Sequence, residues 1–168
     1  DTVKNNNIKR IVDLGCGDFN WMSTIRDEFP DVYYEGWDAN EEMIVELNDQ
    51  YGNENTKFYM KDITEEKLSN FDLVICRDVL FHLEFTNSLK VLRNIDEAQI
   101  PHLITSCFLD VTENTNIVPC PEKISQQWGF YKINLNLEPF NMGDFLVQSL
   151  EENIKNDGYV RSICLYSL

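Results

Sequence analysis

Apolar and polar positions along this chain fall into alternating blocks that predict strands and helices in turn. Short runs rich in apolar residues predict strands at residues 8–14, 32–37, 56–60, 71–76 and 102–109. The run at 71–76 is nearly all apolar, which is typical of a parallel strand covered on both faces. Apolar residues at helical spacing predict helices over 19–29, 40–51 and 87–98. Asn40 is suited to cap the second helix and Gly52 to end it.

The last third of the chain breaks this rhythm. Residues 111–141 carry Pro119, Pro121 and Pro139 among several aromatic side chains, which predicts a long irregular excursion. Such stretches often serve as lids or binding loops. Residues 145–153 and 159–168 then have strand character, and the Asn-Asp-Gly sequence at 156–158 is a strong hairpin signal.

This order of elements predicts an α/β fold with a Rossmann-like, doubly wound, mostly parallel seven-stranded sheet and an antiparallel C-terminal hairpin strand. We expect residues 1–168 to form a single domain, with 111–141 as an acceptor-side excursion within it. In such sheets, ligands bind beyond the carboxyl ends of the strands, at the point where the strand order reverses. The turns after Leu14, Trp37, Met60 and Cys76 should therefore border one crevice.

Composition narrows the classes of partner. The formal net charge of −15 repels phosphate backbones, and the 14 Lys and Arg residues are scattered, so we expect no nucleic-acid partner. No apolar run approaches the roughly 20 residues of a membrane helix, and no signal peptide is visible. The five cysteines form no C-x-x-C pair, and Cys16, Cys76 and Cys107 fall in apolar runs. These features predict reduced core thiols without a bound metal, and a cytoplasmic setting. The chain opens on Asp1 and not Met, which leaves room for an upstream segment.

The turn after the first strand carries the most specific chemistry. Gly15 and Gly17 allow a sharp bend and a close approach of the backbone to a ligand. The dinucleotide fingerprint requires a third glycine at position 20, where this chain has Asn20. Asp13 adds a negative charge where a pyrophosphate would sit, and a carboxylate there suits a cationic amino or sulfonium group instead.

Two further carboxylates follow the next strands. Asp38 ends the second strand, about 20 residues after the glycines, which is the interval expected for a carboxylate that accepts hydrogen bonds from ribose hydroxyls. Asp62 ends the third strand, where it could accept from an adenine amino group. Each carboxylate alone is a common turn residue, but their order on successive strands points to one nucleoside-containing ligand.

With these residues in place, the sequence resembles the class I S-adenosylmethionine-dependent methyltransferases. DLGCG is similar to their first motif, GWDAN to their acidic ribose motif and MKDI to their adenine motif. FDLVICRDVLFHL, HLITSCF and YKINLNLEPFN resemble a bacterial subgroup linked to small-molecule or surface-carbohydrate methylation. The chain departs from that subgroup at Lys132, where Arg is usual, and at Gly143-Asp144, where a Pro-rich stretch is usual.

The resemblance implies S-adenosylmethionine as cofactor and a methyl acceptor that is a small molecule, including a sugar or sugar derivative. The residues expected at the cofactor, by strand-end position and motif, are Asp13, Gly15, Cys16, Gly17, Asp38, Ala39, Asp62, Ile63 and Arg77.

On the acceptor side, His82 is the candidate general base, because histidine exchanges protons near neutral pH and lies on the turn after the fourth strand. A structural histidine is the equally weighted alternative. Asp78 is the second candidate, as a carboxylate that orients the acceptor. Tyr131, Asn134 and Phe140, in the excursion, could line an acceptor pocket or simply pack as a lid.

Three functions remain open at this point. The first is methyl transfer to oxygen or nitrogen of a small molecule. The second is a non-catalytic module that binds S-adenosylmethionine and regulates a partner. The third is a nicotinamide-dependent oxidoreductase, against which both Asn20 and Asp13 argue. The sequence names neither the acceptor nor the oligomeric state.

Overall fold

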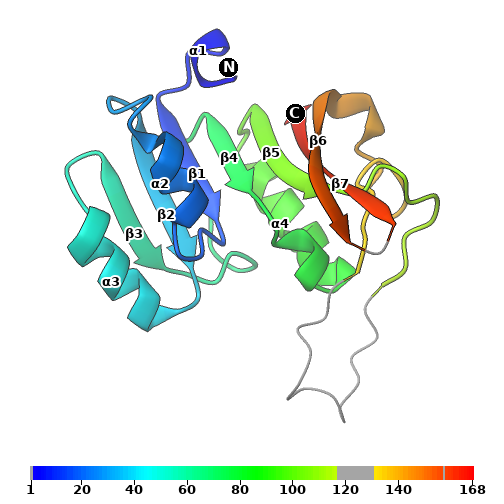
Figure 1. The fold of residues 1–168 in the computed structure, drawn as a ribbon, viewed down its shortest axis with the longest axis horizontal. Helices are drawn as coiled ribbons and strands as arrows, with labels where there is room; N and C mark the ends of the chain where they lie inside the picture. The colour runs from blue at the N-terminus through cyan, green and yellow to red at the C-terminus, as the bar shows by residue number, and fades with distance from the viewer. Residues whose placement is uncertain (1, 117–130, 157) are drawn as a thin grey trace.

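A computed structural model describes residues 2–116, 131–156 and 158–168, and it contains one seven-stranded sheet in the order β3-β2-β1-β4-β5-β7-β6 (Figure 1). The strands are β1 (Arg10–Leu14), β2 (Tyr33–Asp38), β3 (Thr56–Met60), β4 (Leu73–Cys76), β5 (His102–Cys107), β6 (Leu146–Asn156) and β7 (Tyr159–Ser167). The α-helices are α1 (Thr2–Asn5), α2 (Asn20–Arg26), α3 (Glu41–Tyr51) and α4 (Phe85–Glu97), and the short 3-10 helices are η1 (Leu80–His82) and η2 (Gly143–Phe145). Strands β1 to β5 pair in parallel and β7 runs antiparallel to both neighbours, which confirms the predicted fold class.

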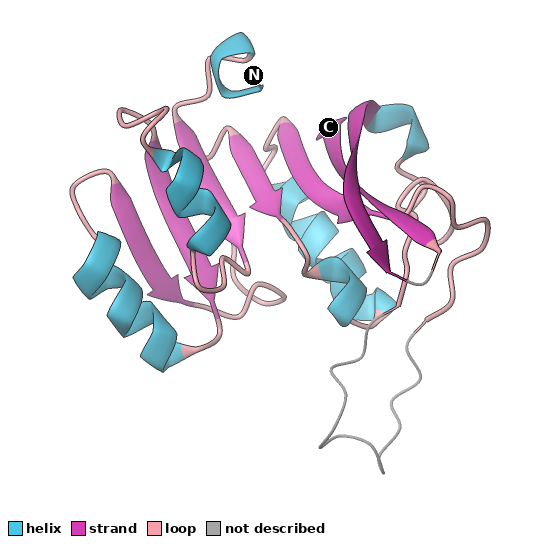
Figure 2. Ribbon diagram, viewed as in Figure 1, coloured by secondary structure: helices cyan, strands magenta, loops and turns pink. Residues whose placement is uncertain are grey.

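Helices cover the two faces of the sheet unequally (Figure 2). Met22 of α2 and Ile44 of α3 pack with Ile11 of β1 in one apolar cluster. Val91 of α4 packs with Val74 of β4 in a second cluster. Because neighbouring strand residues point to opposite faces, β1 and β4 contribute to both clusters, and this burial on two sides explains their apolar runs.

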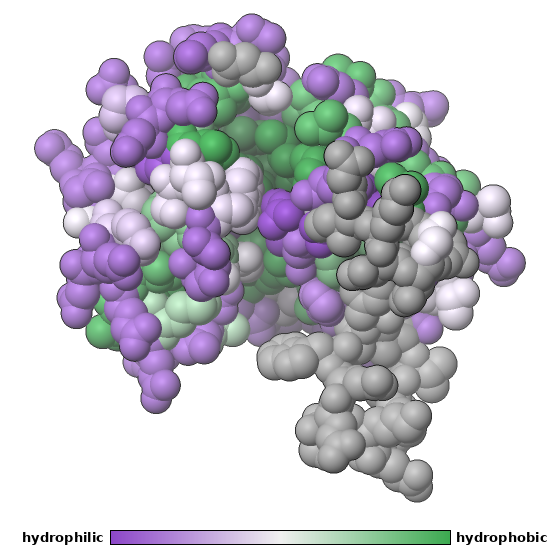
Figure 3. Space-filling model, in the orientation of Figure 1, coloured by the Kyte–Doolittle hydropathy of each residue, from purple (hydrophilic) through white to green (hydrophobic). Residues whose placement is uncertain are grey.

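The α2 face of the sheet is hollowed beside that helix. Trp21 and Ile25 of α2, with Ile75, Ile104 and Ile163 of three adjacent strands, are among the residues that line an apolar cavity of about 310 Å³. Figure 3 shows this region as a hydrophobic hollow in the molecular surface. No helix of the described residues is long and apolar enough to cross a membrane.

Helix α2 ends earlier than its apolar spacing predicts. The sequence suggests a helix up to the residue before Pro30, but the last helical residue is Arg26. The Arg26 guanidinium donates to the carbonyl oxygens of Phe29 at 2.5 Å, Val32 at 2.6 Å and Asn55 at 3.2 Å, all of which follow α2 in the chain. These bonds satisfy carbonyl groups of the loop that follows α2 and of the loop before β3, so the side chain fixes the chain where it leaves the helix. The Asn40 cap is confirmed, since its side chain accepts from the Met43 N–H at 3.2 Å.

The predicted excursion begins and ends in well-packed structure. Ile133 and Leu135 are fully buried in the α4-side cluster, and the Phe108 N–H donates to the Ile133 carbonyl at 2.8 Å. Residues 117–130, which include Cys120 and much of the predicted excursion, lie outside the described residues, as does Asp157 of the predicted hairpin turn. The hairpin itself is confirmed, because β6 and β7 pair in antiparallel register. Cys16, Cys76 and Cys107 are buried free thiols, as predicted.

Candidate functional site

The turn after β1 has the backbone that its glycines predict. Gly15 and Gly17 have φ angles of 76° and 55°, in the left-handed region that disfavours residues with a Cβ. The N–H groups of Gly15 and Cys16 both donate to the Trp37 carbonyl, at 2.8 and 3.1 Å, which fixes the turn against the end of β2. A Cβ at Gly15 would lie 2.4 Å from the Val79 side chain, whereas a Cβ at Gly17 would meet nothing within 4 Å. The turn therefore needs glycine at one position for packing and presents open space at the other.

Asp38 lies directly beside this turn. Its Oδ2 accepts from the Gly17 N–H at 3.1 Å, and its Oδ1 accepts from the Asn40 N–H at 3.1 Å. A carboxylate has about four acceptor positions, so two backbone bonds orient the group and leave capacity for two neighbouring hydroxyls. This arrangement is suited to the ribose role predicted for Asp38.

Asp62 is oriented in a comparable way after β3. Its Oδ1 accepts from the Thr64 N–H at 2.9 Å and from the Thr64 hydroxyl at 2.7 Å. These two bonds, the side-chain bond above all, hold the pKa of Asp62 below its usual value, so the group is an ionised acceptor. Both bonds fall on Oδ1, and Oδ2 remains available to accept from an amino group.

A cavity of about 400 Å³ joins these residues at the carboxyl ends of β1 to β4. Its lining includes seven of the predicted site residues, namely Gly15, Asp38, Ala39, Asp62, Ile63, Asp78 and His82. Lys61, Thr64, Val79 and Leu83 complete the wall. The volume is in the range of small-molecule sites. Lys61 and Thr64 flank the predicted pair Asp62 and Ile63 in the sequence, and this proximity is the signal by which they could have been predicted. Val79 and Leu83 are apolar, and the sequence does not distinguish them from core residues.

Asp13 is not in the wall of this cavity. It is 2% exposed, and its Oδ2 accepts from the Tyr34 hydroxyl at 2.8 Å. Burial raises the pKa of Asp13 from 3.8 to about 7, against the lowering effects of the Tyr34 hydrogen bond and of the Arg77 charge. Cys16 is also buried, and burial raises the pKa of its thiol. Neither of these predicted cofactor residues lines the cavity.

The raised pKa of Asp13 predicts how stability responds to pH. Between about pH 4 and 7 the native state binds more protons at Asp13 than the unfolded state does, so this group lowers stability as the pH rises. Asp13→Asn removes the titration. The unfolding free energy of Asp13→Asn relative to the wild type should therefore increase by about 2–3 kcal/mol from pH 5 to pH 8. The slope is about 1.4 kcal/mol for each pH unit between the unfolded and the native pKa of Asp13. Urea unfolding of both proteins measures this difference, and a value independent of pH would contradict the proposed burial of a titrating carboxyl.

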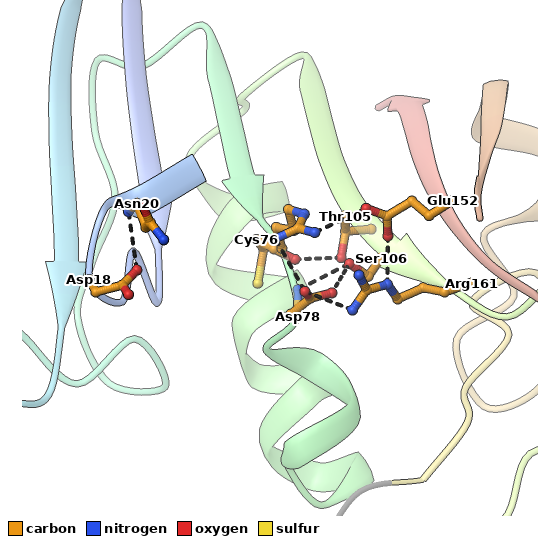
Figure 4. Close-up of polar contacts among 9 residues, drawn as sticks. Asp18, Asn20, Cys76, Asp78, Thr105, Ser106, Glu152 and Arg161 are labelled. Carbon is orange, nitrogen blue, oxygen red and sulfur yellow. Dashed lines mark hydrogen bonds and ion pairs between the residues drawn. The ribbon is translucent and has the colours of Figure 1, made fainter. Parts of the chain in front are cut away.

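Arg77 and Asp78 follow directly on β4, and Asp78 lies in a network of charged side chains with Arg161 and Glu152 (Figure 4). Arg77 pairs with Asp78 at 3.2 Å and with Glu152 of β6 at 2.9 Å, and its guanidinium carbon lies 5.4 Å from the centre of the Trp21 ring. Arg77 is therefore engaged in ion pairs within the fold, and it is not among the residues that line the cavity. Glu152, with Ser106 and Arg161, is a participant that sequence reasoning missed, because no local pattern marks it.

His82 ends η1 and is exposed at the rim of the cavity. Its backbone N–H donates to the Val79 carbonyl at 2.9 Å, and its ring lies edge-on to Phe81, with ring centres 4.7 Å apart. The His82 side chain therefore lies on a short turn after β4 whose backbone is hydrogen-bonded, which is the position predicted from the sequence.

The three predicted acceptor residues are distributed differently. The Tyr131 hydroxyl donates to the carbonyl of Leu83, a cavity residue, so Tyr131 lies next to the wall. Asn134 is 5% exposed, and its amide donates to the carbonyls of Leu109 and Val111, which is a structural role within the excursion. Phe140 lines a separate cavity near the C-terminus. Of the three, the structure brings only Tyr131 beside the crevice.

Comparison with known proteins identifies the family. A family model described as a methyltransferase domain matches residues 12–101, which include the glycine turn, all three carboxylates and β4. The chain belongs to this methyltransferase family. The match confirms the predicted class I S-adenosylmethionine-dependent methyltransferase membership and, with it, S-adenosylmethionine as the cofactor.

Individual relatives are more distant. Trans-aconitate 2-methyltransferase of Mycolicibacterium gilvum is 46% identical over 37 residues, which span 22% of this chain and only 14% of that protein. Magnesium protoporphyrin IX methyltransferase of Synechocystis PCC 6803, with bound S-adenosylhomocysteine, has a TM-score of 0.68 at 20% identity over 99% of this chain and 78% of that one. N-methyltransferase NodS of Bradyrhizobium japonicum WM9 has a TM-score of 0.71 at 15% identity over 99% and 81%. At these identities the structures establish the fold of the methyltransferase domain.

The crevice of this methyltransferase fits its cofactor. The open space in front of Gly17 admits a ligand against the backbone, and Asp38 and Asp62 are oriented acceptors on successive strands. Among the described residues no group of His, Cys, Asp and Glu is arranged to hold a metal ion.

Proposed function

We propose that this methyltransferase transfers a methyl group to an oxygen or nitrogen atom of a small molecule. The observation that carries the proposal is the single cavity bordered by Asp38 and Asp62 toward one end and by Asp78 and His82 toward the other. One group of side chains is suited to hold a nucleoside, and the other stands where an acceptor can arrive.

Separate residues of the chain would bind the cofactor and take the proton of the acceptor. When bound, S-adenosylmethionine supplies a methyl group already activated by its sulfonium. Asp38 would accept from the ribose hydroxyls and Asp62 from the adenine amino group, while the glycine turn would let the ligand approach the backbone. An acceptor hydroxyl must lose its proton as the new bond forms, and His82 at the rim takes that proton on an imidazole nitrogen. Alignment of acceptor and donor accounts for most of the rate.

Charge and relatives support a small acceptor. The net charge of −15 disfavours polyanions, and two similar proteins are named for trans-aconitate and magnesium protoporphyrin IX, which are small molecules. Within this class, the resemblance of YKINLNLEPFN favours a sugar or sugar derivative.

Calorimetry and methyl transfer together test the proposal. S-adenosylmethionine and S-adenosylhomocysteine should bind, NAD should not, and radiolabelled methyl should pass to a member of a panel of sugars, amines and carboxylic acids. Binding without transfer to any acceptor class would favour the regulatory module instead.

Asp38→Ala tests the nucleoside end of the cavity. Loss of a charged hydrogen-bond acceptor should weaken S-adenosylhomocysteine binding by about 10- to 100-fold. Asp72→Ala is the matched control, because Asp72 also accepts two backbone N–H groups, those of Lys9 and Arg10 at 2.8 Å each, at the opposite end of the sheet. Equal affinity in Asp38→Ala and the wild type would remove the ribose assignment.

A further inference from the structure

The turn between β4 and η1 contains a residue in an unfavourable backbone conformation. Asp78 has a φ of 60°, in the left-handed region that residues with a Cβ rarely occupy. Such a conformation costs on the order of 1 kcal/mol and persists only when surrounding contacts hold it. The contacts from outside this turn that hold Asp78 come from two strands distant in the sequence, β5 and β7.

Ser106 of β5 makes the closest of these contacts. Its hydroxyl accepts from the Asp78 N–H at 3.0 Å and donates to the Asp78 Oδ1 at 2.6 Å. Ser106 is 1% exposed, so both bonds are shielded from water. One side chain thereby fixes the backbone and the carboxylate of Asp78 together.

Arg161 of β7 and Glu152 of β6 lie beside Asp78 (Figure 4), and with Arg77 the three side chains complete a closed ring of ion pairs. Arg161 contacts the Asp78 Oδ2 at 2.9 Å and the Glu152 Oε2 at 2.5 Å, and Arg77 bridges the same two acids. The four side chains are only 16–27% exposed. Partial burial makes such pairs stronger than surface pairs, and two positive charges balance two negative ones.

The held turn determines one wall of the cofactor cavity. Val79 follows Asp78 and packs so closely on Gly15 that any Cβ there would clash with it. Asp78, Val79, His82 and Leu83 all line the cavity. A change in the Asp78 backbone would therefore move this wall relative to the glycine turn.

We propose that Ser106 is a positioning residue of the methyltransferase. With support from the Arg161–Glu152 pair, Ser106 holds Asp78 in its left-handed conformation, and this fixes the wall of the cofactor cavity from Asp78 to Leu83. The inference rests on the proposed function and deepens it, because it assigns a role to the C-terminal hairpin. The hairpin strands β6 and β7 contribute none of their described residues to the cavity lining, and they act on it through the contacts of Arg161 and Glu152 with Asp78 and Arg77.

Affinity for S-adenosylhomocysteine, measured by calorimetry, tests this role without activity. Ser106→Ala removes both bonds to Asp78 and should weaken binding about 3- to 10-fold. Thr105→Val is the matched control: the neighbouring hydroxyl is also buried and donates to the Cys76 carbonyl at 2.7 Å, but it does not contact Asp78. Its affinity should stay within about twofold of the wild type. If Ser106→Ala does not fold, Arg161→Gln provides the same test, with Arg93→Gln on α4 as its control.

A rescue experiment separates positioning from general stability. Asp78→Gly adopts a positive φ without strain and has no carboxylate to hold. In that background, Ser106→Ala should change affinity by less than about twofold. An undiminished effect of Ser106→Ala in the Asp78→Gly protein would overturn the inference, as would wild-type affinity in both Ser106→Ala and Arg161→Gln. Failure of the wild type itself to bind S-adenosylhomocysteine would overturn the proposed function instead.

Discussion

Replacement of His82 by alanine should slow methyl transfer to a hydroxyl acceptor by about 100- to 10,000-fold, the contribution of a positioned general base. His82 is exposed at the rim of the cavity, on the turn that follows β4, and β4 lies beside β1 at the point where the strand order reverses. Acceptor and donor methyl must meet at that point. A side chain there can reach the acceptor without occupying the nucleoside end of the cavity.

The same variant should keep its cofactor. Because His82 is exposed and ends η1 after β4, whereas Asp38 and Asp62 follow β2 and β3, affinity for S-adenosylmethionine should remain within about twofold and the melting temperature nearly unchanged. His102→Ala is the control, since the other histidine of the chain pairs with Leu73 and Ser167 at the opposite end of the sheet. Single-turnover rates measure the effect.

A His82→Ala protein as fast as the wild type would make His82 structural. The acceptor would then be an amine that arrives neutral, or the proton would be taken by another group, with Asp78 the next candidate in the cavity. Comparison of a hydroxyl with an amine acceptor on the same variant distinguishes these cases.

Gly17→Val should abolish measurable cofactor binding, a loss of about 100-fold or more, because a branched side chain would enter the open space in front of the turn and would strain a left-handed backbone. The N–H of Gly17 also holds Asp38, so a shifted turn would release the carboxylate predicted to bind the ribose. Calorimetry with S-adenosylhomocysteine measures the loss.

Gly158→Val separates strain from obstruction. Gly158 has a φ of 77°, and a Cβ there would also meet nothing within 4 Å, but it lies in the β6–β7 turn. Both variants should lose similar stability, about 1–2 kcal/mol for a left-handed residue with a Cβ. Only Gly17→Val should lose the cofactor. Retained affinity in a folded Gly17→Val protein would remove the glycine turn from the cofactor site.

Local pattern determined much of this protein. Alternating apolar runs and helical spacing predicted the order of the strands and helices, because burial on a sheet or along a helix imposes its own period. The cap of α3 by Asn40 follows from the geometry of one turn. Asp38 and Asp62 could be grouped in advance, because parallel strands bring their carboxyl ends to a single edge.

Contacts between distant segments were decided only by the tertiary structure. Nothing near Arg26 in the sequence indicates that its guanidinium joins the loop after α2 to the loop before β3, because one of its partners, Asn55, is 29 residues away. Asp13 has the spacing of a ligand-facing acid, but the placement of Tyr34 on the neighbouring strand buries it.

The same reason applies to the turn after β4. Ser106 lies 28 residues and Arg161 83 residues from Asp78 along the chain. They meet it because β5 lies next to β4 and β7 next to β5, in registers that pair Thr105 with both Cys76 and Cys164. Strand order and register are set by the packing of the whole sheet and leave no local trace in the sequence. The candidate site residues could therefore be predicted from the sequence, whereas the network that holds Asp78 in place could be identified only from the tertiary structure.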